Sequence, residues 1–369
     1  MKVHSISFTG QIIDAHVHSG NWWRNGNLTD HTKEIDTFTK QLLPNGDTVE
    51  RVVVSNLDCM VRVNKDNEPI RFLSDEIEGN KKLLELANKN PKIIPLATCQ
   101  PIYGSAQNIS KLLEENPNRF FGLKFHPEQL DIAADSEVYN QYMDIAKKNN
   151  LPCLFHSGQS FDTQYVPASK VSKPQQIYSL AKRFPEIPVI MAHMGGNEGE
   201  NTKAALNCII ESVKNNDAKL YADISWVDCD NPQKPTLKEV IKSLKEYNAL
   251  DRIMFGTDAP LGRFGFEGEH NIQPINAYNE NINNIKTMIK QEFGKEADSI
   301  IEKLFYKNAQ NLFINKTWLP KTENIKQGVS KTKLAVIFGS IVGVIAGISL
   351  LISKTCCQQV VESSQKNRE

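Results

Sequence analysis

Short apolar runs alternate with helical patterns along most of the chain, and this alternation constrains the fold more than any other feature. Eight runs are rich in β-branched and other apolar residues and have the length of buried strands. They are residues 11–17, 51–56, 92–99, 122–126, 152–156, 188–193, 219–225 and 252–257. Most of the segments between them carry apolar residues at helical spacing, which predicts a parallel sheet.

The number of these units favours a closed (β/α)₈ TIM barrel, because eight strand–helix units in about 250 residues suit that fold. The alternative is an open doubly wound sheet, which usually carries a glycine-rich phosphate turn after its first strand. This chain has His16-Val17-His18 in that place. The predicted barrel domain covers residues 1–315, and a polar linker follows at 316–333.

The C-terminal part departs from this pattern. Residues 334–352 contain no charged side chain, and lysines flank the stretch on both sides. Its 19 residues are close to the length that crosses a bilayer as a helix. The predicted fold class is therefore α/β, a TIM barrel with a C-terminal transmembrane helix at 334–353 and a polar tail at 354–369. More lysines precede the stretch than follow it, which predicts a single-pass membrane protein with a cytoplasmic barrel.

Composition narrows the range of partners. The chain has 43 basic and 43 acidic side chains, and this balance argues against a dedicated nucleic-acid-binding protein. Its seven cysteines form no CxxC pair and no zinc-finger spacing, which favours a reducing compartment. The expected partners are a small-molecule substrate, a membrane and, as one option, a second copy of the chain.

Two histidines at the end of the first predicted strand are candidate metal ligands. His16 and His18 are separated by one residue, so a regular strand directs both side chains to one face. Neutral imidazole is a good ligand for zinc and related metals. Asp14 falls on the same face by this period, where it is a candidate to orient a ligand histidine.

Further polar residues end other predicted strands. His126, His156 and His193 end the fourth, fifth and sixth strands, and Asp258 follows the eighth. In a TIM barrel the carboxyl ends of the strands meet around one mouth, where active sites form. Five of the eight histidines are thus predicted to meet at this mouth.

Several motifs resemble the amidohydrolase superfamily, and in particular its branch of metal-dependent hydrolases and decarboxylases. They are Ile-Asp-Ala-His-Val-His at 13–18, Gly-Leu-Lys-Phe-His-Pro at 122–127, Phe-His-Ser-Gly at 155–158, Ala-His-Met-Gly-Gly at 192–196 and Phe-Gly-Thr-Asp-Ala-Pro at 255–260. Residues 306–313 also resemble the helix that follows the eighth strand in that branch. The resemblance spans roughly residues 11–315 and is more specific for the superfamily than for the reaction.

The resemblance implies a divalent metal held by His16, His18, His156 and Asp258. Zinc is the expected ion, with one ion preferred and two as an alternative. Three imidazoles and a carboxylate leave a coordination position open for water, as a catalytic site requires. By the same resemblance Asp258 takes the proton of that water, and His193 is either a ligand of a second metal or a group that stabilises charge on the substrate.

Two residues of the fourth strand are expected to contact substrate. Lys124 resembles a position where some amidohydrolases carry a carbamylated lysine that bridges two metals. The preferred alternative is a free amine that binds a substrate carboxylate or phosphate. His126 either contacts the substrate or packs at the strand end, and the direction of Asp223 on the seventh strand stays open.

The predicted function is that of a metal-dependent hydrolase, which uses activated water to attack the carbonyl of an amide, ester or lactone. The alternative is a metal-dependent non-oxidative decarboxylase or hydratase with the same ligands. A third hypothesis is a membrane-anchored scaffold without catalysis, which predicts no bound metal.

Overall fold

The computed structural model describes residues 10–24, 27–60, 62–63, 69–70, 73–158, 172–196, 199–227, 229, 235–261 and 274–320. The chain divides into two compact units, Met1–Leu319 and Pro320–Glu369. Apart from Pro320, the second unit lies outside the described residues. The fold and the site below belong to the first unit.

Eight parallel strands form the centre of this unit, as predicted. In sheet order they are β1 (Gln11–Ser19), β4 (Thr48–Asn56), β7 (Ile93–Thr98), β8 (Gly122–Phe125), β9 (Cys153–Phe155), β10 (Pro188–Met191), β11 (Lys219–Asp223) and β12 (Ile253–Met254). The last strand returns to the first, because Ala15 N–H donates to Phe255 C=O over 2.9 Å and His18 N–H donates to Ala259 C=O over 2.7 Å. The sheet is therefore a closed barrel.

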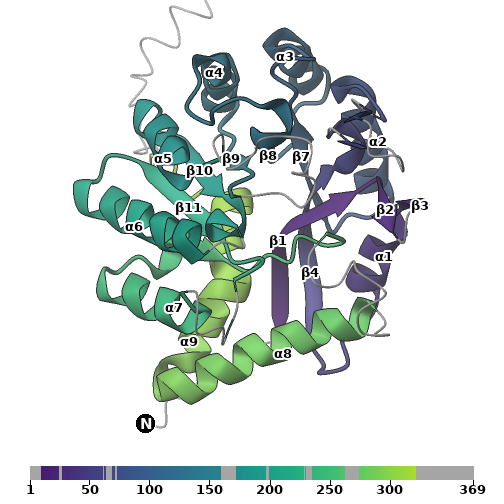
Figure 1. Ribbon diagram of the computed structural model, residues 1–369. Coiled ribbons are helices and arrows are strands. Elements are labelled where there is room, and N and C mark those ends of the chain that lie inside the picture. Colours follow the sequence, from purple (N-terminus) through teal and green to yellow (C-terminus); the bar gives the residue numbers. More distant parts are fainter. Residues whose placement is uncertain are drawn as a thin grey trace, which may run out of the picture. The chain divides into compact units, whose positions relative to one another are not determined.

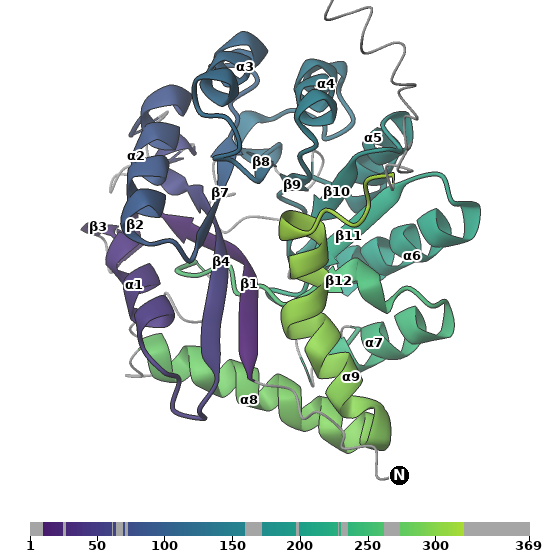
Figure 2. The same cartoon turned by 180° about the vertical axis from the view of Figure 1, so that it is seen from behind.

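Helices surround the barrel on its outer side (Figures 1 and 2). They are α1 (Thr32–Lys40), α2 (Glu76–Lys89), α3 (Ala106–Glu115), α4 (Asn140–Asn149), α5 (Pro174–Arg183), α6 (Gly199–Asn215), α7 (Leu237–Glu246), α8 (Pro274–Phe293) and α9 (Ala297–Glu302). After α9 the chain continues in π-helical turns, Lys303–Lys307 and Gln310–Ile314. Two short hairpins, β2 (Asn21–Arg24) with β3 (Asn27–Asp30) and β5 (Arg62–Val63) with β6 (Pro69–Ile70), follow β1 and β4.

Local sequence signals explain where the helices begin. Asp75 precedes α2 and its carboxylate accepts hydrogen bonds from the backbone N–H groups of Ile77 and Glu78. Thr236 and Glu239 form a reciprocal capping box at the start of α7. Such caps satisfy the N–H groups that the first turn of a helix leaves without a partner.

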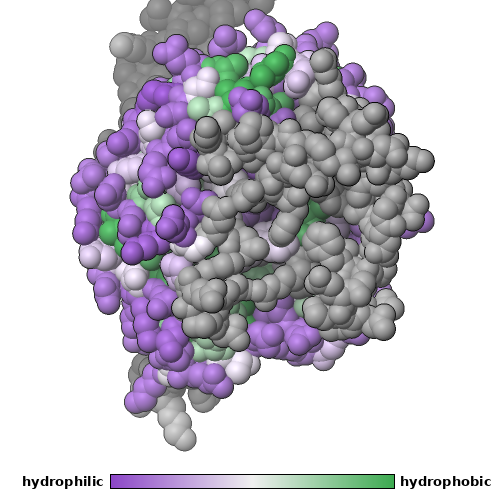
Figure 3. Space-filling model, viewed as in Figure 1, coloured by the Kyte–Doolittle hydropathy of each residue, from purple (hydrophilic) through white to green (hydrophobic). Residues whose placement is uncertain are grey.

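The apolar core has two parts. The larger part lies between the sheet and the helices, and the smaller part fills the barrel. The smaller part takes Ile13, Ala15 and Met254 from strands, and Phe313 from the C-terminal turns, which cover the end of the barrel opposite the mouth. On the face seen in Figure 3 the described surface is mainly hydrophilic, with apolar side chains in a few small areas.

An irregularity in β1 reverses the alternation of its side chains. Ile13 and Ala15 belong to the barrel interior, whereas Val17 belongs to the outer core. The pairing of β1 with β4 shifts register between Asp14 and Val17, as at a β-bulge. His16 therefore points inward, while Asp14 points outward and contacts Tyr278 of α8.

The predicted transmembrane helix, and with it the predicted membrane location, is corrected. No helix in the described part of the chain is both long and apolar enough to cross a membrane. α8 has 20 residues, but polar and charged side chains such as Glu280 and Lys286 interrupt its sequence, and a span needs about 20 mainly apolar residues. The stretch at 334–352, on which the prediction was based, lies outside the described residues.

Candidate functional site

The mouth at the carboxyl ends of the strands gathers the histidines that the sequence placed there. His16, His18, His156 and His193 are all buried, and His126 is partly exposed. Ring contacts link them: His16 lies 4.9 Å from His18 and 4.8 Å from His193, measured between ring centroids. The expected convergence of five histidines is therefore present.

Asp223 orients His16. Its carboxylate Oδ2 accepts a hydrogen bond of 3.0 Å from Nδ1 of His16. A carboxylate only accepts, so Nδ1 carries the ring proton and Nε2 keeps its lone pair. Gly256 makes room for this pair, because an added Cβ would lie 3.0 Å from Cβ of Asp223 and 3.1 Å from Cβ of His16.

Asp258 lies against both histidines of β1. Its Oδ1 is 2.9 Å from Nε2 of His18 and 3.4 Å from Nε2 of His16. Ser55, at the end of β4, lies 2.9 Å from Nδ1 of His18 and fixes the other side of that ring. Trp226 donates its indole N–H to Oδ2 of Asp258 over 2.9 Å. The donor atoms of His16, His18 and Asp258 all lie within 4.8 Å of one another.

These three residues fit a divalent cation. Burial lowers the pKa of His16 well below its ordinary value, and the nearby Lys124 lowers this pKa further. A buried neutral imidazole with a lone pair directed inward is the form that binds metals. Two imidazoles and a carboxylate suit zinc, manganese or iron, and the surrounding hydrogen bonds hold these groups in place.

Lys124 is buried inside the same group. Its ammonium Nζ lies 3.0 Å from Nε2 of His16. Burial lowers the pKa of Lys124 to about 8, although Asp258 and Asp223 act in the opposite direction. At neutral pH the side chain still carries its charge for most of the time, so it is placed to attract an anionic ligand.

His193 connects the first group to a second one. Ser225 donates its hydroxyl proton to Asp223, so its oxygen must accept from Nδ1 of His193, 2.7 Å away. Nε2 of His193 then accepts from Nδ1 of His156 over 3.3 Å. Burial lowers the pKa of His193 well below its ordinary value, consistent with a neutral ring.

The second group contains His126, Glu128 and His156. Their donor atoms also lie within 4.8 Å of one another. Glu128 begins a 3₁₀ turn (Glu128–Leu130) just after β8 and is almost completely buried. The His126 and His156 rings are stacked, with centroids 3.9 Å apart.

Three members of the predicted ligand set, His16, His18 and Asp258, lie together. The fourth, His156, has Nδ1 3.3 Å from Nε2 of His193 and Nε2 3.1 Å from Oε2 of Glu128. Four residues of the site, Glu128, Ser55, Ser225 and Trp226, are absent from the predicted set. Only Glu128 has a sequence signal that points to it, because it follows His126 by two residues just after a predicted strand.

Asp14 has a different role from the one expected. It accepts hydrogen bonds from backbone N–H groups of His16 and Thr257 and from the hydroxyls of Thr257 and Tyr278. It therefore ties β1 to the segment after β12 and to α8. Asp223, rather than Asp14, holds a histidine ring.

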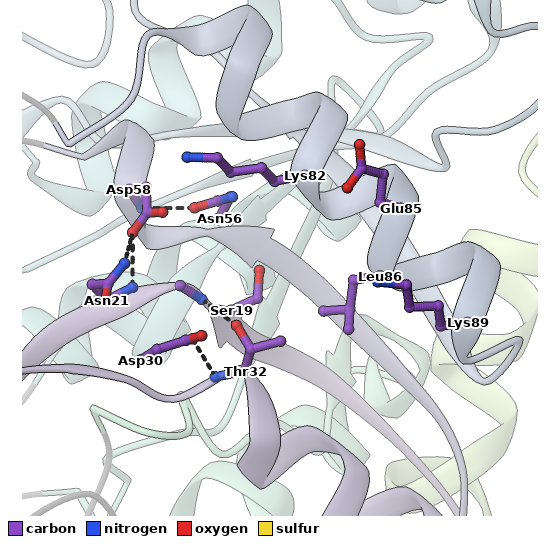
Figure 4. Close-up of a pocket in the computed structure, with 11 residues that line it drawn as sticks. Ser19, Asn21, Asp30, Thr32, Asn56, Asp58, Lys82, Glu85, Leu86 and Lys89 are labelled. Atoms are coloured by element: carbon purple, nitrogen blue, oxygen red, sulfur yellow. Dashed lines mark hydrogen bonds between the residues drawn. The ribbon is translucent and has the colours of Figure 1, made fainter.

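Two pockets lie near the mouth. One of 730 Å³ is lined by residues of α7 and α8 and by Ser225, Trp226 and Thr257, which border the histidine groups. Another of 320 Å³ is lined by residues including Ser19, Asp58 and Lys82, where Asp58 accepts hydrogen bonds from Asn21 (Figure 4). The described residues that line these two pockets include no member of either histidine group.

Solved structures similar to this one include enzymes of two kinds. A probable 2-pyrone-4,6-dicarboxylic acid hydrolase from Acinetobacter baumannii, solved with citric acid bound, is 14% identical over 82% of this chain and 98% of that chain, with a TM-score of 0.51. A 5-carboxyvanillate decarboxylase from Novosphingobium aromaticivorans, complexed with manganese and a nitrobenzoic acid, is 12% identical over 82% of this chain and 96% of that chain, with a TM-score of 0.52. At such identities the likeness shows the shared fold.

A family model gives the stronger result. The model described as amidohydrolase matches residues 80–313, which contain most of the barrel and every member of the two groups except His16 and His18. No curated protein sequence matches the chain. The match covers more than half of the chain, and the chain belongs to the amidohydrolase family.

Proposed function

We propose that this protein is a metal-dependent hydrolase that acts on the carbonyl group of a small carboxylated molecule. The observation that carries the proposal is the convergence of His16, His18 and Asp258 at the barrel mouth, with donor atoms within 4.8 Å of one another. These residues are proposed to hold the metal. His156, also predicted as a ligand, contacts Glu128 and His193 and is left out of this assignment.

The residues around the proposed metal position each have a proposed role in the reaction. A bound divalent metal would supply hydroxide near neutral pH and polarise the carbonyl oxygen. Asp258 accepts the proton of the attacking water through Oδ1, while Trp226 keeps the carboxylate in place through Oδ2. His193 is proposed to stabilise charge on the substrate, because its ring stacks on His16 at the same mouth.

Lys124 suggests the substrate class. A buried ammonium group 3.0 Å from a proposed metal ligand is placed to pair with a substrate carboxylate. The two similar structures are named as a dicarboxylic acid hydrolase and a carboxyvanillate decarboxylase, and both names refer to a carboxylated compound.

The same observation supports a second candidate, a metal-dependent non-oxidative decarboxylase. A carboxylate held by Lys124 can be the group that is lost as CO₂ rather than a handle for binding. The two reactions differ in their products, since hydrolysis adds the elements of water and decarboxylation releases CO₂ without adding water to the organic product.

The test uses full-length protein loaded with Mn²⁺ or Zn²⁺ and a panel of carboxylated lactones, esters and aromatic carboxylic acids in H₂¹⁸O. Hydrolysis predicts ¹⁸O in the organic product, whereas CO₂ release without that label establishes the decarboxylase instead. His16→Ala should lose one equivalent of metal and the activity. His31→Ala removes an equally buried histidine outside both groups and is the matched control. Full metal content and activity in the His16→Ala protein would refute the assignment.

A further inference from the structure

The pocket of 320 Å³ beside β1 has a buried hydroxyl group without a partner on its wall. Ser19 ends β1, lines this pocket and is 3% exposed. Its Oγ forms no hydrogen bond within the described part of the chain. Buried polar atoms normally find partners, so a hydroxyl left over on the wall of a cavity points to a polar molecule inside that cavity.

The pocket lies behind the strands that carry part of the proposed metal site. In the pairing of β1 with β4, His18 is opposite Ser55 and Ser19 is opposite Asn56. His18 and Ser55 contact each other at the mouth, with Oγ of Ser55 2.9 Å from Nδ1 of His18. Ser19 and Asn56 line the pocket together with residues of α2 (Figure 4). Successive residues of a strand point to opposite faces, so the two sites share one wall.

The wall of the pocket offers both donors and acceptors. Asp58 is buried, and its Oδ1 accepts hydrogen bonds from the backbone N–H and the side-chain amide of Asn21 over 2.7 and 3.0 Å. Asp30 accepts from the backbone N–H of Thr32 through its own Oδ1. A carboxylate has acceptor sites on both oxygens, so Oδ2 of each residue can accept from a ligand. Oγ1 of Thr32 accepts from Gly20 N–H over 3.1 Å, and its proton can be donated to a ligand.

The charges around the pocket favour a neutral ligand. Charged side chains of both signs are among the described residues that line it, namely Asp30, Asp58, Glu85, Lys82 and Lys89. An anion would face the carboxylates and a cation would face the ammonium groups. A ligand hydroxyl both donates and accepts, so neighbouring hydroxyls on one molecule suit a wall of this kind. Leu86 adds an apolar side chain against which the carbon atoms of such a molecule can pack.

We propose that this pocket binds a small neutral polyol of about the size of a monosaccharide. Its volume of 320 Å³ lies at the lower end of the roughly 300–1,000 Å³ that small-molecule sites occupy. One ligand hydroxyl pairs with Ser19, and others donate to Asp30 and Asp58. A bound polyol orders the ends of β1 and β4 and so tightens metal binding by His18. This coupling rests on the proposed function, whereas the pocket itself does not.

Binding of three polyols to metal-stripped, full-length protein tests the site. Glycerol, xylitol and D-glucose serve as the probes, and saturation-transfer NMR and calorimetry measure their binding. The wild type should bind at least one of them. Ser19→Ala should lower the affinity about 10-fold, because a ligand hydroxyl then loses its partner in a buried place. Ser172→Ala removes another buried hydroxyl without a hydrogen bond, at a residue outside the pocket lining, and should leave the affinity unchanged.

A second variant covers the case in which Ser19→Ala does not fold. Leu86→Trp enlarges a partly exposed side chain on α2 and should abolish binding by filling the pocket, with thermal unfolding as the check on folding. If no polyol binds to the wild type, or if both variants bind as the wild type does, the proposal is wrong. Glycine is included as a zwitterion, and binding of glycine without binding of any polyol overturns the assigned ligand class.

Titration with Mn²⁺ separates this proposal from the proposed function. The polyol should raise the affinity for Mn²⁺ about 5-fold, and Mn²⁺ should raise the affinity for the polyol by the same factor. Polyol binding that leaves the Mn²⁺ affinity unchanged would refute the coupling. His16→Ala should lose the metal and still bind the polyol. A wild type that binds the polyol but no metal would support the pocket and refute the proposed metal site.

Discussion

Trp226 donates its indole N–H to Oδ2 of Asp258 over 2.9 Å, while Oδ1 of the same carboxylate faces His18 at 2.9 Å. Both Trp226 and Asp258 have positive φ angles, 65° and 57°, so the backbone after β11 and the backbone after β12 both turn sharply to bring them together. The carboxylate is thus held by Trp226 on one side and faces the histidines of β1 on the other.

Replacing Trp226 by Phe should weaken metal binding by about 10- to 100-fold, because groups that orient metal ligands typically contribute this much. The protein should remain folded, since Phe keeps most of the ring. Competition with a coloured chelator measures the affinity. Trp318→Phe, which removes an indole N–H bonded to Leu312 C=O, is the control and should leave the affinity unchanged. Equal affinities for the two variants would contradict the role of Trp226.

Replacing Lys124 by Met should raise the KM for a carboxylated substrate by about 10- to 100-fold, because a hydrogen bond to a charged group contributes about 1.5 to 3 kcal/mol. In the wild type the same KM should rise as the pH passes upward through about 8, where Lys124 loses its proton. The variant should lack that rise. Steady-state kinetics between pH 6.5 and 9.5 measure both effects, and Lys148→Met, on the surface of α4, is the control. A KM that stays unchanged in the Lys124 variant would exclude an ion pair with substrate.

The buried carboxyl group of Asp14 should make the free energy of unfolding depend on pH. Burial raises its pKa from 3.8 to about 7, although hydrogen bonds from Thr257, His16 and Tyr278 oppose the shift. Between these two values the folded protein holds a proton that the unfolded chain has released. The contribution of Asp14 to the free energy of unfolding is therefore fully present below about pH 4 and falls as the pH rises toward 7.

This decline should be absent from Asp14→Asn. The difference in unfolding free energy between the metal-stripped wild type and the variant should shrink by at most about 4 kcal/mol from pH 4 to pH 7. Urea unfolding at several pH values measures it. Asp144→Asn, at an exposed position on α4, should keep the pH dependence of the wild type. A constant difference across this range for Asp14→Asn would contradict the raised pKa.

Gly158 offers a comparison between two glycines with nearly the same backbone conformation. The φ angles of Gly158 and Gly46 are +85° and +86°, but an added Cβ meets Gly195 O at 2.2 Å in the first case and nothing within 4 Å in the second. Gly46→Ala should destabilise the protein by roughly 1 kcal/mol, the usual effect of a side chain in this conformation. Gly158→Ala should destabilise it clearly more, because the backbone that follows His193 must move. Denaturant unfolding of both variants measures the difference, and equal losses would rule out the close approach.

The sequence alone determined the barrel and the strands that carry the site. Alternating apolar runs and helical patterns are local properties, and eight such units admit few arrangements, so all eight predicted strands are present in the expected order. The amidohydrolase motifs gave the family, which the family model confirms over residues 80–313. The transmembrane helix was predicted from the length of the uncharged stretch at 334–352 and its flanking lysines. No helix in the described part of the chain is long and apolar enough to cross a membrane.

Tertiary structure decided which side chains face one another. A regular strand places Asp14 and His16 on one face, but a register shift in β1 sends Asp14 outward to Tyr278. Asp223 orients His16 across the barrel, over 207 positions of sequence, and no local period reports such a pairing. Glu128 meets His156 only because the turn after β8 folds its carboxylate into the mouth. Strand periodicity ends where the strand ends, and beyond that point the turns, bulges and packing of distant segments set the direction of each group.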